Sequence, residues 1–187
     1  MVAQKKLLRR EMQARRKSLP EIERESFSDV IAEKFLAQEI YQRAEIVMAY
    51  VSMPEEVQLK KIFVDAFNRK KILAIPLIVG KGEMQPVIVP DFAALEIGAF
   101  GIYTVREDSR KFVDAEKINC VIVPGAAFDV NKNRLGLGGG YYDKFLPRAV
   151  DAKKIALAYD FQIVEDLPIE PHDSPVDMII TEKRIIE

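Results

Sequence analysis

The segment best suited to chemistry is the glycine-rich stretch Arg134–Asp143, which reads RLGLGGGYYD. It holds four of the chain's nine glycines within five positions, after an apolar run and before a stretch of helix-forming residues. Glycine is costly to order, so this clustering favours a backbone whose N–H groups surround an anion, next to a helix N-terminus and the cation of Arg134. The spacing matches neither the Walker loop nor the dinucleotide fingerprint. We predict a phosphate-binding loop; a tight strand-to-helix connection is the alternative.

Two aspartates are candidate magnesium ligands. Asp143 falls in the first turn of the helix expected after the glycines, where a carboxylate also stabilises the helix N-terminus. Asp173 lies in a loop between Pro171 and Pro175, where turn formation is the simpler explanation. Carboxylate oxygens suit Mg²⁺, so the two would form a site beside bound phosphates if their loops meet.

The first 17 residues carry seven cations and one acid, Glu11. Lys5 and Arg9 are four positions apart, which places them on one face of the helix expected there. This face is either a solvated surface or a cationic wall for polyphosphate or for the polyanionic tail of a substrate. The stretch has no aromatic residue and the net charge of the chain is -1, so we do not expect nucleic-acid binding.

The remaining candidates point away from covalent catalysis. Glu56 follows a predicted strand and could accept hydrogen bonds from a substrate heterocycle, or it could stabilise a helix N-terminus. Of Tyr141 and Tyr142, one ring could stack on a flat ligand while the other packs inward. No G-x-S-x-G motif is present, and Cys120, the only cysteine, lies in an apolar strand. Catalysis by positioning and charge neutralisation, as in phosphoryl transfer, fits this inventory better.

These side chains need a scaffold of strands and helices. Apolar runs predict strands at 45–51, 71–75, 84–89, 118–123, 155–159 and 178–181, and helices are expected at 2–17, 20–37, 57–69 and 141–148. This alternation indicates an α/β fold: a single three-layer αβα domain over residues 1–187, with a largely parallel sheet and helices on both faces. Ligands of such folds bind beyond the carboxyl ends of the strands, where the loops at Ser52, 124–140 and Asp160 could meet.

Composition excludes several other classes of protein. The chain is 49% hydrophobic and 30% charged, without an apolar run long enough for a membrane span. One cysteine cannot form an intramolecular disulfide or a cysteine-based zinc site. We expect a cytoplasmic monomer that acts on small molecules and binds neither membrane nor nucleic acid.

Taken together, these segments resemble the 5-formyltetrahydrofolate cyclo-ligase family, also called methenyltetrahydrofolate synthetases. The matching segments are Lys5-x-x-x-Arg9, YVSMPEE at 50–56, VPGAAFD at 123–129, NRLGLGGGYYD at 133–143, 158–162, 167–168, 172–173 and 176–177. They follow the order of the family and span most of the chain. The glycine segment is the most specific, whereas 80–117 matches only loosely, through Gly101-Ile102.

The resemblance implies a role for each site residue. ATP, the co-substrate, would be bound by Lys5, Arg9, Arg134, Leu135, Gly136, Leu137, Gly138, Gly139, Gly140, Tyr141 and Tyr142. The folate would be bound by Arg9, Val51, Glu56, Tyr103 and Tyr141. Arg134 and Tyr141 would be catalytic, and Asp143 and Asp173 would hold Mg²⁺. Gly139 departs from the pattern, because some relatives carry a lysine there.

The reaction implied by the resemblance needs no nucleophile from the protein. The formyl oxygen of 5-formyltetrahydrofolate attacks the γ-phosphate of ATP, N10 attacks the activated carbon, and phosphate leaves as the ring closes. Two alternatives remain at this point. One is a non-catalytic protein that binds a nucleotide or a sugar phosphate. The other is a sugar-phosphate isomerase with Asp129, Asp143 or Glu56 as its general base.

Overall fold

The main sheet carries the elements around which the site is built. The structure, a computed structural model, describes residues 1–98 and 103–187. Seven strands lie in the order β12-β11-β9-β6-β1-β2-β3. Their bounds are β1 Ile46–Met48, β2 Ile72–Gly80, β3 Glu83–Ile88, β6 Cys120–Val123, β9 Lys153–Leu157, β11 Met178–Ile180 and β12 Ile185–Ile186. The five central strands are parallel and the two edge strands are antiparallel, which confirms the α/β class.

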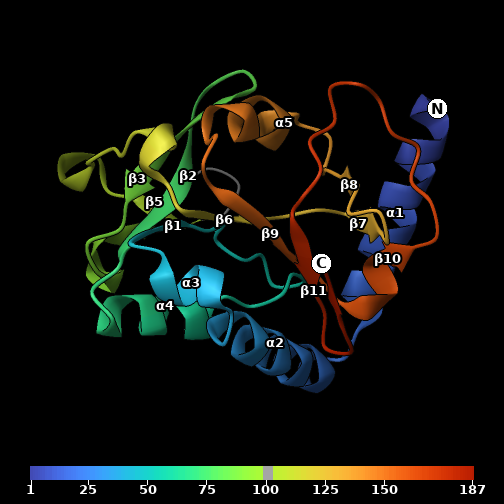
Figure 1. Cartoon of the computed structure of the whole chain (residues 1–187), viewed down its shortest axis with the longest axis horizontal. Coiled ribbons are helices and arrows are strands. Elements are labelled where there is room, and N and C mark those ends of the chain that lie inside the picture. Colours follow the sequence, from blue (N-terminus) through green and yellow to red (C-terminus); the bar gives the residue numbers. More distant parts are fainter. Residues whose placement is uncertain (99–102) are drawn as a thin grey trace.

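Helices lie against both faces of this sheet (Figure 1). The described helices are α1 Val2–Ser18, α2 Glu21–Leu36, α3 Glu39–Arg43, α4 Lys60–Asn68 and α5 Tyr141–Phe145. On one face, Val47 of the sheet shares a core with Phe35 of α2 and Phe63 of α4. On the other face, Val121 shares a core with Phe145 of α5. A five-residue helix and the 3-10 turn Leu146–Arg148 supply this second layer, which is thinner than a symmetric three-layer arrangement.

Several expected boundaries were wrong, and the strand expected at 45–51 spans only Ile46–Met48. The helix expected at 57–69 begins only at Lys60, because Ser52 Oγ donates to Val57 O (2.8 Å) and accepts from Leu59 N (3.1 Å), which holds 57–59 as a loop. The strand expected to end at residue 75 continues to residue 80 and turns back as β3 in a hairpin. The helix expected at 141–148 stops at 145, where a 3-10 turn containing Pro147 follows.

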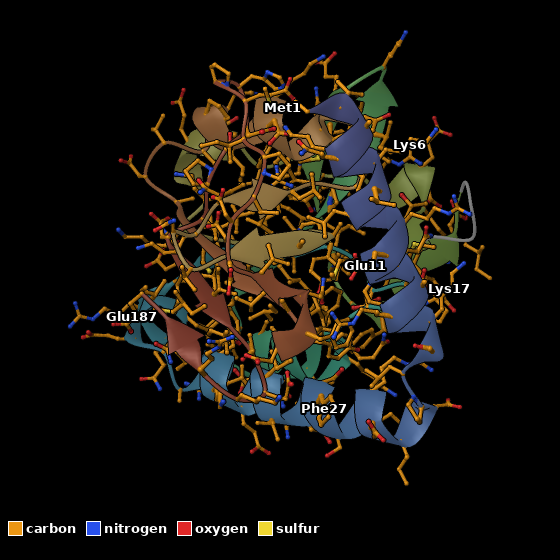
Figure 2. All side chains as sticks on the ribbon, turned by 90° about the vertical axis from the view of Figure 1, so that its right-hand side faces the viewer. Met1, Lys6, Glu11, Lys17, Phe27 and Glu187 are labelled. Atoms are coloured by element: carbon orange, nitrogen blue, oxygen red, sulfur yellow. The ribbon has the colours of Figure 1, made fainter. Side chains whose placement is uncertain are left out.

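Helix α1 packs against a small sheet that the sequence did not predict. This sheet has the order β10-β7-β8, with β7 at Ala127–Asp129, β8 at Arg134–Leu135 and β10 at Ile163–Val164. Met12 of α1 shares a core with Ala127 and Leu135. Figure 2 shows α1 along the outside of the molecule, with Lys6, Glu11 and Lys17 marking its length. Because β8 leads directly into the glycines, this packing sets α1 beside the glycine loop.

Two further features complete the fold. A separate two-stranded sheet pairs β4 (Leu95–Ile97) with β5 (Tyr103–Val105). No helix among the described residues is long and apolar enough to cross a membrane. The loosely matching Gly101-Ile102 lies outside the described residues, and a single domain over 1–187 stays a prediction.

Candidate active site

At two glycines of the loop, the absence of a side chain lets the large side chains of neighbouring residues approach the backbone closely. A Cβ added to Gly136 would lie 2.9 Å from Arg134 Nη1, and a Cβ added to Gly139 would lie 2.7 Å from the ring of Tyr141. Both separations are below normal contact, so these positions exclude a side chain unless their neighbours move. The loop is therefore shaped to let a guanidinium and an aromatic ring approach its backbone closely.

The other two glycines bend the loop toward α1. Gly138 has φ +110° and Gly140 has φ +67°, the left-handed region that favours glycine. Arg9 of α1 donates from Nε to the carbonyl oxygen of Gly136 at 2.8 Å. A Cβ on Gly138 would lie 3.8 Å from that Nε, so the side chain of Arg9 lies directly against the loop. The structure thus brings a predicted ATP-binding cation of α1 onto the predicted phosphate loop.

Arg134 is held inside the protein by its own partners. Its side chain is 2% exposed and forms an ion pair from Nη2 with Oδ1 of Asp143. Nη1 also donates to the carbonyl oxygen of Pro124 at 3.2 Å, and the guanidinium lies 5.9 Å from the centre of the Tyr142 ring. The pair locks β8 to α5. Its cation would therefore have to be shared with Asp143 when it meets phosphate.

Lys5, which lies on the same face of α1 as Arg9, also forms ion pairs with carboxylates. Lys5 Nζ lies 2.5 Å from Oδ2 of Asp173 and 2.7 Å from Oε2 of Glu170. Burial pushes the pKa of Lys5 down, but its hydrogen bonds to the two carboxylates leave that pKa raised. Burial pushes the pKa of Asp173 up, but the hydrogen bonds from Lys5 and from the amide of Glu170 leave it lowered. Both groups are therefore charged at neutral pH.

The loop that carries Asp173 meets the glycine loop. The backbone N–H of Ser174 donates to Asp143 Oδ1 at 3.2 Å, so the two predicted magnesium ligands come from segments in direct contact. The ligand atoms of Glu170, His172 and Asp173 lie within 4.8 Å of one another, and Asp143 is not part of that group. The carboxylates fit a hard cation such as Mg²⁺, which takes oxygen ligands and leaves its other positions to water and phosphate.

Glu56 is the buried residue of a turn before α4, and its partner Arg16 was missed by sequence reasoning. Glu56 is 6% exposed and accepts from the amide of Met53 at 3.0 Å, with Arg16 Nη1 at 3.5 Å from its Oε1. Burial raises the pKa of Glu56, against the opposing effects of the Met53 amide and the Arg16 cation. Since α4 begins at Lys60, Glu56 does not stabilise a helix N-terminus. A signal for Arg16 was present, because positions 5, 9, 12 and 16 share one helical face.

Some of the predicted binding residues line two separate hollows. Val51 and Tyr103 line one of about 360 Å³, together with Phe63 and Phe92. The glycine loop lines the other, of about 230 Å³. Its lining includes Arg134, Gly136, Leu137, Gly139, Gly140, Tyr141, Tyr142 and Asp143. Lys5, Arg9, Glu56 and Asp173 line neither hollow, so the structure does not bring all the predicted residues to one cavity. Apolar and aromatic walls suit a flat heterocycle in either hollow.

Comparisons with known proteins agree on one family. A family model described as the 5-formyltetrahydrofolate cyclo-ligase family matches residues 1–182. The mouse protein named 5-formyltetrahydrofolate cyclo-ligase is 30% identical over 192 residues, which cover 95% of this chain and 93% of the mouse chain. An Escherichia coli protein of the same name is 23% identical over 92% of this chain and 97% of its own.

Solved structures agree as well. A 5,10-methenyltetrahydrofolate synthetase from Aquifex aeolicus is similar with a TM-score of 0.86 and 34% identity, covering 97% of this chain and 91% of that one. A synthetase of the same name from Mycoplasma pneumoniae gives a TM-score of 0.76 at 23% identity, covering 95% and 98%. The first likeness extends to sequence, and the second supports the fold alone.

Proposed function

The chain belongs to the 5-formyltetrahydrofolate cyclo-ligase family, and we propose that it converts 5-formyltetrahydrofolate to 5,10-methenyltetrahydrofolate with ATP, releasing ADP and phosphate. The observation that carries the proposal is the meeting of distant motif segments at one place. Arg9 bonds the glycine loop, Lys5 bonds Asp173, and the Asp173 loop bonds Asp143. These residues are up to 168 positions apart in the chain.

The proposed chemistry transfers a phosphoryl group and then closes a ring. The formyl oxygen attacks the γ-phosphorus of ATP, the bond to ADP breaks, and an imidate-like phosphate forms on the formyl group at N5. N10 then attacks the activated carbon, and inorganic phosphate leaves with the former formyl oxygen. A preorganised site lowers the barrier by aligning the reacting groups and stabilising the charge on the phosphate oxygens.

Different groups of side chains would bind ATP, the folate and Mg²⁺. Lys5, Arg9 and the backbone of 134–142 would hold ATP, with Arg134 and Tyr141 aligning the reacting groups. Glu56, Val51, Tyr103, Arg9 and Tyr141 would hold the folate. Asp143 and Asp173 would hold Mg²⁺, which neutralises phosphate charge when bound.

Two residues that could have supported other chemistry, Cys120 and Asp129, are buried and have structural roles. Cys120 is fully buried, and burial raises the pKa of its thiol to about 12, so it is no nucleophile near neutral pH. Asp129 is fully buried and accepts hydrogen bonds from the amides of Asn131, Asn133 and Leu167 and from the side chain of Asn133. That saturation removes Asp129 as the general base of the isomerase alternative, and Asp143, a second candidate, is already paired with Arg134.

The proposal also covers the location of the protein, its oligomeric state and its binding partners. We propose a cytoplasmic monomer that takes small-molecule substrates and binds neither nucleic acid nor membrane. The binding-only alternative is less well supported, because relatives that match most of this chain are named as the enzyme.

The direct test is the absorbance of the methenyl product when pure protein is mixed with 5-formyltetrahydrofolate, ATP and Mg²⁺. Product should appear only when all components are present, with one ADP released per product formed. Controls omit ATP, omit Mg²⁺ or replace ATP with a non-hydrolysable analogue. ATP binding without product or ADP release would instead support the binding protein.

A further inference from the structure

The pair between Arg16 and Glu56 is buried yet loosely closed. Arg16 is 5% exposed and Glu56 is 6% exposed, and their closest approach is 3.5 Å. That distance is at the outer limit of a hydrogen bond, whereas charged pairs usually close to about 2.8 Å. Removing two charges from water is costly and is offset only by close geometry, so this pair contributes little to stability.

One donor of this pair, Arg16 Nε, is buried without a hydrogen-bond partner among the described residues. The hydroxyl of Tyr142, whose pKa responds to the charge of Glu56, is buried without a partner as well. Burying a donor without an acceptor destabilises a protein, and a ligand that accepts from the donor removes that cost. Tyr142 is in α5, next to the glycine loop of the proposed ATP side.

Among the titratable groups around the Arg16–Glu56 pair, Glu56 is the one whose charge can change near neutral pH. Glu56 is faced by Arg16 from α1, Glu55 from its own turn, Tyr50 after β1, Tyr142 from α5 and Tyr159 after β9. Burial raises the pKa of all three tyrosines, to about 12 for Tyr159, so their hydroxyls stay neutral near neutral pH. Tyr50 and Tyr159 donate to the backbone carbonyls of Val57 and Glu56. Within this pocket Arg16 is therefore the cation closest to the Glu56 carboxylate.

We propose that Arg16 is a positioning residue for the folate: it holds the Glu56 carboxylate charged and in place to accept hydrogen bonds from the heterocycle. This inference rests on the proposed function, which gives Glu56 its substrate. It adds a second task for α1, whose other end faces the phosphate site. One helical face, with Lys5, Arg9, Met12 and Arg16, thus serves both substrates.

The test separates folate binding from ATP binding. We compare Arg16→Met, Arg16→Lys and the control Arg10→Met, which removes an exposed arginine of the same helix. Arg16→Met should raise the KM for 5-formyltetrahydrofolate about ten-fold and leave the KM for ATP within about two-fold. Arg16→Lys should recover part of the loss, because it restores the charge but not the planar guanidinium. Arg10→Met should match the wild type.

The pH dependence supplies a readout that a merely structural role would not move. Without Arg16 the pKa of Glu56 rises further, so the acid limb of kcat/KM for the folate should move to higher pH by about one unit. In ¹³C-labelled protein, the Glu56 carboxyl, assigned with Glu56→Gln, should titrate at a correspondingly higher pH in Arg16→Met. If Arg16→Met does not fold, Arg16→Gln, which also removes the charge but keeps polar atoms, carries both measurements.

The two proposals fail in different ways. A wild-type protein that forms no product removes the proposed function, while the carboxyl titration still tests Arg16. An equal rise in both KM values, an unchanged folate KM, or an unmoved Glu56 titration in folded Arg16→Met or Arg16→Gln would overturn the positioning role.

Discussion

The two sides of the candidate site hold their charges differently. On the phosphate side, Lys5 pairs with Asp173 at 2.5 Å and Arg134 pairs with Asp143, and we call these the closed pairs. On the folate side, Arg16 and Glu56 form the open pair, at 3.5 Å with a donor left over. The closed pairs stabilise the fold and, under the proposed function, would have to be shared with a polyanion. The open pair stabilises little and, under the proposal for Arg16, is arranged for a ligand. Each prediction below tests this contrast.

The largest expected effect follows from breaking a closed pair. Arg134→Ala leaves Asp143 without its cation and removes the bond to Pro124. We expect a loss of about 3 kcal/mol in the free energy of unfolding and a loss of about ten-fold or more in ATP use. Urea unfolding and steady-state kinetics measure the two effects. Arg148→Ala, which removes an exposed arginine nearby, should change neither by much, and wild-type stability in Arg134→Ala would contradict the closed pair.

A second prediction concerns the shape of the phosphate side. Gly139→Ala would place a methyl group 2.7 Å from the Tyr141 ring, which must then move. We expect kcat/KM to fall about ten-fold, because Tyr141 aligns the reacting groups, with little change in stability at this exposed loop. Gly80→Ala is the matched control, because its methyl group would meet nothing closer than 3.7 Å. Equal kinetics in the two variants would show that the ring position is unimportant.

The same geometry bears on Gly139, where the resemblance implies a lysine in some relatives. A lysine at this position would also meet the Tyr141 ring, so in this chain the glycine and the ring position are linked. The closed pairs and Arg9 then carry the positive charge around the loop. This makes the phosphate side more dependent on α1.

The glycine loop and its arginine were indicated by the local sequence, whereas the pairing of Arg16 with Glu56 was not. A glycine cluster with an adjacent arginine indicates phosphate binding from neighbouring residues alone. The buried strands β1 and β6 follow from short apolar runs. The small β10-β7-β8 sheet has strands of two or three residues, too short for any periodic signal. Its pairing nevertheless sets α1 against the loop, which no local pattern indicates.

Arg16 shows the same limit at one residue. Arg15 and Arg16 are adjacent and chemically identical, yet Arg15 is exposed and Arg16 is buried. Helix phase relative to Lys5 and Arg9 distinguishes them, but only a fold that buries this face gives the phase a meaning. Composition alone therefore predicted a basic helix and not which of its cations are functional.

A third prediction separates the metal role of Asp143 from its pairing role. Asp143→Asn keeps the size of the side chain and can still accept from Ser174, but it loses the charge that pairs with Arg134. We expect the Mg²⁺ concentration for half-maximal activity to rise a few-fold, since a neutral amide is a weaker ligand. Activity measured in a Mg²⁺ titration provides the check. An unchanged titration would leave Asp143 as the partner of Arg134 and nothing more.

The smallest expected effect, in Lys5→Met, gives the most direct comparison of a closed pair with the open pair. Lys5→Met should lower the free energy of unfolding by about 1 kcal/mol at neutral pH, because the Lys5–Asp173 pair is only partly buried. The lowered pKa of Asp173 means that the pair contributes above the usual aspartate value of 3.8 and is lost as pH falls below it. Urea unfolding of Lys5→Met and the wild type should therefore converge only below about pH 4. Arg16→Met leaves the buried Glu56 carboxylate without its cation, which is destabilising even though the intact pair contributes little. The raised pKa of Glu56 predicts that this loss disappears at a higher pH than the loss in Lys5→Met, because Glu56 is protonated first. Convergence of both variants at the same pH would mean that the open and closed pairs do not differ.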